Sequence, residues 1–271
     1  MKKIVLFILL MCMFITGCSQ AQNISKNNNE LMVRIIFPED EFKKLDNTND
    51  DSEVIVSKET ELATKETIDP TKPMIALTFD DGPSKHTEHL LDIFSEHGGK
   101  ATFFVVGNLI DNRPETLQRM VTDGHEIGGH SWDHRQLTKL SSEEITNEIM
   151  NTRAKIYSIT GVDTTIMRPP YGSYNDEIKC ICKEKGIVMI NWAVDTLDWK
   201  TRDADKVYDA IMSQVKDGDI ILCHDLYGTT VDAMERVIPD LIAQGYQLVT
   251  VSELLSYGEK DVKAGTVHTK R

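Results

Sequence analysis

The chain has 271 residues, of which 40% are hydrophobic and 27% are charged, and its formal net charge is −13. This composition is typical of a globular protein, and the length allows one large domain or two small ones. The acidic balance argues against a nucleic acid or an anionic membrane surface as the partner, because a basic patch is the usual electrostatic signature of either, and it favours a neutral or cationic substrate.

Residues 1–17 have the pattern of a secretory signal. Two lysines follow Met1, and the apolar run IVLFILLMCMFI comes next, which is too short to span a bilayer comfortably. The run ends in ITGC, which resembles the bacterial lipobox, where the cysteine is lipidated and becomes the mature N-terminus. The sequence therefore predicts an exported protein that is lipid-anchored through Cys18 on the outer face of the cytoplasmic membrane. A plain cleaved signal and an uncleaved anchor are the alternatives.

Residues 18–72 are polar and rich in Asn, Asp, Glu, Lys and Thr. This composition predicts a largely flexible tether. One apolar patch interrupts it, LMVRIIF at residues 31–37. The patch either packs on the folded domain as a strand or is poorly ordered, and the sequence does not decide between the two.

A regular alternation of helix and strand patterns begins at Met74. Helical patterns end in glycine, as expected for a helix C-cap, and short apolar runs follow, as expected for strands buried on both faces. Strands that alternate with helices indicate parallel pairing and right-handed crossovers. Seven strands are predicted, in the segments MIALTF, HGGKATFFVVG, TDGHEIGGH, TTIMRPP, EKGIVMINW, KDGDIILCH and AQGYQLVTV.

These units define a folded domain at residues 73–256, with a polar tail at residues 257–271. Seven units in this length favour an α/β fold, a distorted and shortened (β/α) barrel with parallel strands; a doubly wound open sheet is the alternative. The capping box Ser141-Ser-Glu-Glu predicts a long helix that ends just before Gly161.

Polar side chains follow most of the predicted strands at their carboxyl ends. Barrels and open α/β proteins build their active sites at this edge, so we expect these side chains to meet in one site. They are Asp80 and Asp81 after the first strand, His130 and His134 after the third, Arg168 and Tyr171 after the fourth, Asp195 after the fifth and His224 after the sixth.

His130 and His134 are four residues apart, so on a helical turn both imidazoles project from the same side. With one carboxylate they form a three-ligand site that leaves a position for water, the arrangement of catalytic zinc. Asp80 and Asp81 would divide the work, one binding the cation and the other taking a proton. Neighbouring residues on an extended strand point in opposite directions, so both are not expected to bind the ion, and the residues alone do not say which one does.

Arg168 and His224 complete a candidate acid–base set. The Arg168 guanidinium can hold a carboxylate in bidentate geometry and keep it away from the metal. His224 can act as a general acid if a carboxylate such as Asp195 orients it and favours its protonated form. Trp199 and Tyr171 can form the aromatic walls of a carbohydrate site, although Trp199 could equally belong to the core.

In this order and spacing, TFDDGP, HSWDH, RPPYG, DTLDW and LCH resemble the five motifs of the polysaccharide deacetylase family, carbohydrate esterase family 4. The resemblance covers about residues 73–255, nearly all of the folded part. It implies a distorted (β/α) barrel that removes acetyl groups from N-acetylated sugars with a divalent metal ion, zinc in the first place, with cobalt or manganese as alternatives.

Carried over residue by residue, the resemblance makes Asp80 the catalytic base and Asp81 the metal ligand beside His130 and His134. Arg168 resembles the residue that holds the base. None of these positions departs from the family pattern, which argues against an inactive member.

For the leaving group and the substrate, the resemblance implies that His224 is the general acid and that Asp195 tunes it. The backbone N–H of Tyr171 resembles the group that helps bind the oxyanion. Trp199, in the same motif as Asp198, is expected to line the groove.

Export and anchoring would make the cell wall the nearest polymer, so the expected substrate is N-acetylglucosamine in peptidoglycan. Two alternatives stay open. One is an O-acetyl esterase that acts on a xylan-type polysaccharide with the same residues, and the other is a wall-binding lipoprotein that keeps the fold without turnover.

Overall fold

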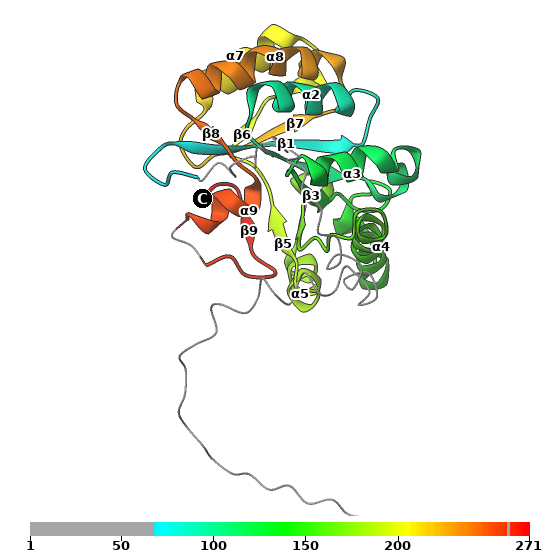
Figure 1. Ribbon diagram of the computed structural model, residues 1–271. Helices are drawn as coiled ribbons and strands as arrows, with labels where there is room; N and C mark the ends of the chain where they lie inside the picture. The colour runs from blue at the N-terminus through cyan, green and yellow to red at the C-terminus, as the bar shows by residue number, and fades with distance from the viewer. Residues whose placement is uncertain (1–67, 259–260) are drawn as a thin grey trace, which may run out of the picture. The chain divides into compact units, whose positions relative to one another are not determined.

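The computed structural model describes residues 68–258 and 261–271 (Figure 1). They belong to a compact unit that extends over Lys65–Arg271. The predicted signal peptide, the lipid attachment at Cys18 and the apolar patch at residues 31–37 lie outside the described residues, as does most of the tether. In the part of the chain that the structure describes, no helix combines the length and the apolar character needed to cross a membrane.

The described residues form one sheet in which all pairings between named strands are parallel. The strand order is β6-β7-β1-β2-β3-β4-β5-β9, and β8 also pairs with β1. All seven predicted strands are present, and the short strands β6 and β9 are additional. The bounds are β1 Met74–Gly82, β2 Ala101–Val105, β3 Glu126–Gly129, β4 Ile166–Met167, β5 Val188–Ile190, β6 Val194–Asp195, β7 Ile220–His224, β8 Gln247–Leu248 and β9 Val267–His268.

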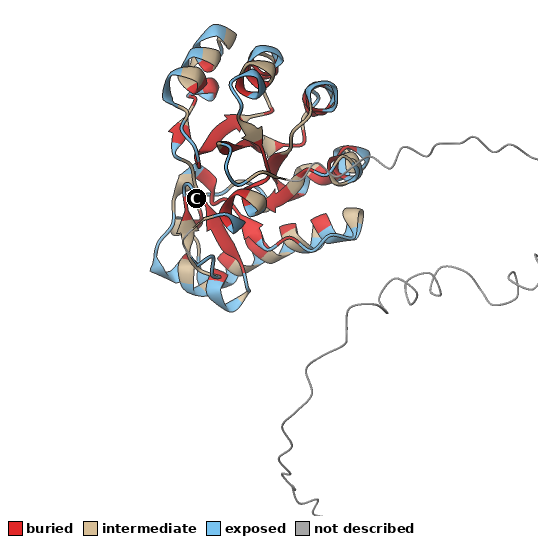
Figure 2. Ribbon diagram, turned by 60° about the vertical axis from the view of Figure 1, so that its left-hand side comes forward, coloured by how far each residue is buried: buried red, intermediate tan, exposed pale blue. Residues whose placement is uncertain are grey.

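The strand order identifies the fold class. From β1 to β5 it runs without the reversal that a doubly wound sheet has, and β7 joins β1 from the other side. The chain passes from β5 to β6 through residues 191–193 alone, without a helix. The sheet therefore curls on itself, with buried strands inside and exposed helix surfaces outside (Figure 2). This is the distorted (β/α) barrel that the sequence predicts.

Helices surround the sheet, and the predicted start and stop signals of the longest are confirmed. The Ser141 side chain accepts the backbone N–H of Glu144, whose side chain accepts the N–H of Ser141, and the helix ends at Gly161 with a left-handed φ of 71°. The bounds are α2 Thr87–His97, α3 Pro114–Thr122, α4 Ser142–Thr160, α5 Asp176–Glu184, α6 Asp198–Thr201, α7 Ala204–Gln214, α8 Gly228–Ala243 and α9 Val251–Ser256, with 3-10 helices η2 Gly107–Asn112, η3 Leu137–Lys139 and η4 Pro170–Gly172.

The central strand β1 is buried because it lies between β2 and β7. Its side chains alternate between two apolar clusters. Leu77 and Phe79 pack with α2, α3, α7 and α8, whereas Ala76 packs with the inward side chains of neighbouring strands and with α9. Because the period of a strand is two residues, Thr78 and Asp80 share the face of Ala76. β1 thus delivers a carboxylate to the interior of the curled sheet.

The end of the segment 257–271, which was predicted to be a polar tail outside the domain, contributes strand β9 to the sheet. Its strand β9 pairs with β5, and Lys270 bridges to Asp219 immediately before β7. We call residues 267–271 the C-terminal clasp because they connect β5 with β7. The sequence did not indicate this role, because the contacts are made by the backbone of a short polar segment.

Candidate active site

Asp80 and Asp81 lie at a bulge near the end of β1. Asp80 and Gly82 pair with successive residues of β2, so Asp81 is an extra residue between them. Its φ is 70°, which is uncommon for a residue with a side chain. The bulge removes the alternation of the strand, and both carboxylates face His130, whose Nε2 is 3.7 Å from Asp80 Oδ2 and 3.3 Å from Asp81 Oδ1. The expectation that the two carboxylates point in opposite directions is therefore wrong.

His130 and His134 are brought together by a loop, and not by the helical turn that their spacing suggests. Ser131 and His134 both have a φ of 61°, and the two imidazole rings are 5.0 Å apart. Glu148 of α4 holds the loop, because its Oε2 accepts two consecutive backbone N–H groups of the loop at 2.8 and 3.1 Å. The same-side geometry was predicted correctly, but its cause is a loop with two left-handed residues.

Asp81, His130 and His134 form a cluster in which the potential ligand atoms all lie within 4.8 Å of one another. Asp81 Oδ1 is 3.2 Å from His134 Nε2. This oxygen is buried and accepts no hydrogen bond from the described residues, although buried polar atoms normally have a partner. A carboxylate and two imidazoles are ordinary zinc ligands and leave one position for water or substrate. The three residues therefore fit a divalent metal ion.

His130 is held in the tautomer that a metal ligand needs. Its Nδ1 lies 2.7 Å from the carbonyl oxygen of Arg168. Because a carbonyl can only accept, Nδ1 carries the proton and Nε2 keeps its lone pair for the cluster.

The electrostatics of the cluster favour a bound cation. Burial opposes the ionisation of Asp81, but His130 and His134 outweigh it and lower the pKa of Asp81 to about 2. Burial also opposes the charging of His130, yet Asp80 and Asp81 raise its pKa. The pKa of His134 is lowered by burial and by His130. The carboxylates of Asp80 and Asp81 thus attract positive charge, whereas His134 prefers to be neutral. A metal ion bound to neutral imidazoles satisfies both preferences better than protonation of both histidines would.

Arg168 holds Asp80, as predicted, but with one nitrogen and not in bidentate geometry. Its Nη1 donates to Asp80 Oδ1 and to Thr78 Oγ1, each at 2.7 Å. Nε and Nη2 donate to the backbone oxygens of Ile190 and Asn191, both at 3.1 Å. The guanidinium is 0% exposed and each of its three nitrogens donates a hydrogen bond, so it fixes Asp80 Oδ1 and leaves Oδ2 facing the metal cluster.

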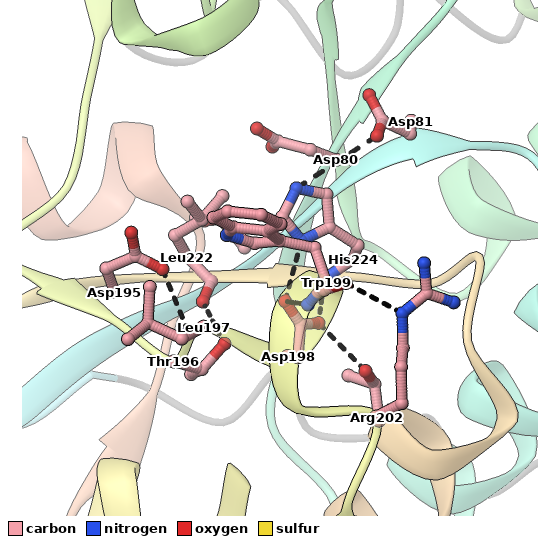
Figure 3. Close-up of polar contacts among 12 residues, drawn as sticks. Asp80, Asp81, Asp195, Thr196, Leu197, Asp198, Trp199, Arg202, Leu222 and His224 are labelled. Carbon is pink, nitrogen blue, oxygen red and sulfur yellow. Dashed lines mark hydrogen bonds and ion pairs between the residues drawn. The ribbon is translucent and has the colours of Figure 1, made fainter.

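His224 is oriented by Asp198, and the prediction that Asp195 orients it is wrong (Figure 3). His224 Nδ1 is 2.8 Å from Asp198 Oδ1, whose partner oxygen Oδ2 accepts the His224 backbone N–H at 2.7 Å and the Thr230 hydroxyl at 2.8 Å. Asp195 instead accepts the backbone N–H of Leu197 at 2.9 Å. The Asp195 side chain thus closes a short turn with the residue two positions further on. Asp198 is the first residue of the short helix α6 and is buried.

Asp198 prepares His224 to donate a proton. Burial lowers the tendency of His224 to charge, but the bond to Asp198 outweighs it, and the pKa rises from 6.5 to about 9. Nδ1 is bound to Asp198, while Nε2 faces the cluster at 4.0 Å from Asp81 Oδ2. At neutral pH the protonated imidazole therefore presents Nε2–H to the site.

Asp198→Asn should move the basic limb of the pH–rate profile downward. The wild type is expected to lose activity as His224 deprotonates near pH 9. Without the carboxylate, the pKa of His224 should return toward its ordinary value, so the limb should shift by about two pH units. The measurement is kcat against pH, and Asp195→Asn is the matched control that should leave the limb in place. An unshifted limb in Asp198→Asn would contradict the assignment.

Tyr171 lies beside His134 of the cluster, Trp199 follows Asp198 on α6, and both are solvent-accessible. Tyr171 has a φ of 62°, is 67% exposed, and its ring lies 4.8 Å from that of His134. Trp199 on α6 is 47% exposed, so it does not belong to the core. The position of both residues is consistent with contact to a substrate.

Three supporting residues were not assigned from the sequence. Thr78 accepts from Arg168, Thr230 donates to Asp198, and Glu148 holds the histidine loop. Thr78 lies within the motif TFDDGP, but Thr230 and Glu148 lie outside all five motifs. Nothing in the sequence around these two residues therefore indicated a role in the site.

Comparison with known proteins identifies the family. The polysaccharide deacetylase model matches residues 67–190. The chain is 35% identical over 190 residues to a peptidoglycan-N-acetylglucosamine deacetylase of Bacillus cereus, which covers 68% of this chain and 89% of that protein. The chain belongs to the polysaccharide deacetylase family. Within the family it is 46% identical over 194 residues to peptidoglycan-N-acetylmuramic acid deacetylase PdaC of Bacillus subtilis, covering 71% of this chain and 41% of PdaC.

The matched part of this chain spans about two fifths of the length of PdaC. A solved structure of the same fold is a family 4 acetyl xylan esterase from Clostridium thermocellum in complex with a cobalt ion. It has a TM-score of 0.68 and 31% identity, and the match covers 73% of this chain and 98% of that one.

Proposed function

We propose that this chain is a metal-dependent hydrolase that removes N-acetyl groups from N-acetylglucosamine-type residues of a polysaccharide, with peptidoglycan as the substrate. The observation that carries the proposal is the arrangement around one point. Asp81, His130 and His134 form a three-ligand cluster. Asp80, which Arg168 holds, lies beside His130, and His224, which Asp198 holds, lies beside Asp81. An acid and a base beside a metal cluster are the groups that metal-dependent amide hydrolysis uses.

Each side chain then has a chemical task. A divalent cation held by the cluster would polarise the acetamide carbonyl and acidify the attacking water. Asp80 Oδ2 accepts the proton of that water, while Arg168 fixes the other oxygen. As the carbonyl oxygen gains negative charge, the backbone N–H of Tyr171 donates to it. His224 then protonates the sugar nitrogen, so that acetate and a free amine leave.

The choice of metal and polymer draws on the ligand set and on the relatives. One carboxylate and two imidazoles suit zinc best, with cobalt and manganese as alternatives. The two sequence relatives are named for peptidoglycan, one for N-acetylglucosamine and one for N-acetylmuramic acid. Peptidoglycan lies outside the cytoplasmic membrane, so this choice of substrate also agrees with the export signal proposed for residues 1–17.

The deciding experiment measures acetate release by residues 65–271 from purified peptidoglycan and from chitin oligomers. We expect release that a chelator abolishes and that added zinc restores. Mass spectrometry of muramidase-digested product then locates the free amine on the glucosamine or the muramic acid residue. No acetate from either substrate in the zinc-loaded protein would refute the proposal.

An O-acetyl esterase is the second candidate, favoured by the likeness to the acetyl xylan esterase. Attack of water on an ester needs the same cluster and base, but a less basic leaving oxygen depends less on His224. Acetylated xylan is therefore the comparison substrate in the same assay. Faster release from xylan than from peptidoglycan would favour the esterase.

We further propose that Cys18 carries a lipid that anchors the protein on the outer face of the cytoplasmic membrane. The lipobox-like ITGC at the end of the apolar run supports this. Cells that express the full chain should incorporate labelled palmitate into it, and Cys18→Ala should abolish the label. Labelling that persists in the variant would contradict the proposal.

A further inference from the structure

Asp225 is a fully buried carboxyl group that the mechanism above does not use. It follows His224 at the end of β7 and is 0% exposed. In the register of β1 and β7, His224 lies opposite Asp80, so Asp225 comes one residue beyond, beside the bulge that carries Asp81. A carboxyl group is costly to bury, and its contacts indicate what it does there.

Asp225 is tied to the loop that follows β1. Its Oδ2 accepts a hydrogen bond from the hydroxyl of Thr87. Its backbone carbonyl accepts the hydroxyl of Ser84 at 2.6 Å, and Thr87 Oγ1 accepts the backbone N–H of Ser84 at 2.8 Å. These bonds join the end of β7 to the start of α2 and to the turn after the metal cluster. An apolar side chain could fill the same space but could not accept from Thr87.

The Asp225 carboxyl also packs on Gly82. A Cβ atom on Gly82 would lie 2.5 Å from Asp225 Oδ2 and 2.6 Å from Oδ1, closer than real contacts allow. Gly82 does not have a positive φ, so its backbone conformation does not require glycine. The close approach of the Asp225 carboxyl does, because it leaves no room for a side chain. In addition, Val106, the residue after β2, donates its backbone N–H to the Gly82 carbonyl at 2.9 Å. The residue after Asp81 is thus fixed by two contacts.

Asp81 has a left-handed conformation that a residue with a side chain adopts only when its surroundings impose it. We propose that Asp225 is a positioning residue of the metal centre, which through Thr87 and Gly82 imposes the conformation that turns Asp81 toward the two histidines. The inference rests on the proposed function, because Asp81 is the residue proposed to bind the metal. It adds a residue that acts on the ligand without contacting the ion.

Zinc affinity tests the inference, because it depends on the position of Asp81 and not on turnover. The metal-free protein is titrated with zinc against a chromophoric chelator. Asp225→Ala is expected to weaken binding by about 10–100-fold, the usual effect of removing a group that orients a ligand. Asp225→Asn keeps the volume and an acceptor for Thr87, so it should stay within about threefold of the wild type. Wild-type affinity in Asp225→Ala, or an equal loss in both variants, would overturn the inference.

Asp219 supplies the matched control. It is also a buried carboxyl, lies immediately before the other end of β7, and accepts the backbone N–H of Lys216 at 2.9 Å. Asp219→Ala should lower the melting temperature as Asp225→Ala does but leave zinc affinity unchanged. If both variants lose zinc affinity alike, the effect is general destabilisation and the positioning role is wrong.

Three further variants keep the test decisive if Asp225→Ala does not fold. Thr87→Val retains the shape but removes the donor, so zinc binding should weaken several-fold; an unchanged affinity contradicts the inference. Gly82→Ala should also weaken binding, and Asp225→Ser/Gly82→Ala, which makes room for the new methyl group, should bind better than Gly82→Ala alone. A wild type that binds no zinc refutes the proposed function, whereas wild-type affinity in all variants refutes only this inference.

Discussion

Asp80→Asn should lower kcat for acetate release by about 10²–10⁴-fold, the contribution of a positioned general base. The amide cannot take the proton of the attacking water, although it keeps the size of the side chain. Zinc should still bind, with a smaller loss of affinity than the removal of a ligand would cause, because the three ligands are Asp81 and the two histidines. The measurements are steady-state acetate release and zinc titration on the same preparation.

Asp195→Asn is the control for this loss. It removes a carboxylate near the same strand ends, one that only closes a turn at Leu197, so kcat should stay close to that of the wild type. If Asp80→Asn retains more than about a tenth of the wild-type kcat, another group is the base.

Arg168→Met should cost about 3–5 kcal/mol of folding free energy, the usual effect of breaking a buried ion pair from one side. The guanidinium and Asp80 are both buried and 2.7 Å apart, so the remaining carboxylate would lose the guanidinium that donates to it while staying out of water. For a domain of this size the melting temperature should fall by roughly 6–20 °C. Calorimetry of the metal-free protein measures the fall directly.

A second substitution separates charge from packing. In the Arg168→Met background, Asp80→Asn removes the uncompensated charge, so the double variant should recover part of the lost stability. The control is Arg236→Met, which breaks an exposed pair with Asp205 and should change the melting temperature little. Equal melting temperatures for Arg168→Met and Arg236→Met would contradict the buried-pair argument.

Much of the fold was predictable because the main strands carry long apolar runs bounded by glycines. MIALTF and DIILC are continuous enough to be assigned as buried strands, and their order with the helices indicates parallel pairing. The strands β6 and β9 were missed because neither follows a predicted helix that ends in glycine, the signal that marked the equally short β4 and β8. A two-residue strand shows no periodicity, and its pairing is made by the backbone.

The site was predictable in residue type more than in geometry. Parallel strand ends meet at one edge, which is why Asp81, His130 and His134 could be expected to converge. The choice between Asp195 and Asp198 depends on a turn in which Leu197 has a φ of 53°, and spacing gives no sign of it. The bulge at Asp81 was equally hidden, since a left-handed residue there results from packing between elements distant in the chain.

The C-terminal clasp has a consequence for the order of folding and for handling the protein. It can dock only after β5 and β7 are both in place, since it contacts Asp219 as well as β5, and contacts between distant segments form slowly. Docking of residues 267–271 is therefore expected to be a late event. A purification tag or fusion partner attached directly behind Arg271 would compete with this step, whereas one placed before residue 65 would not.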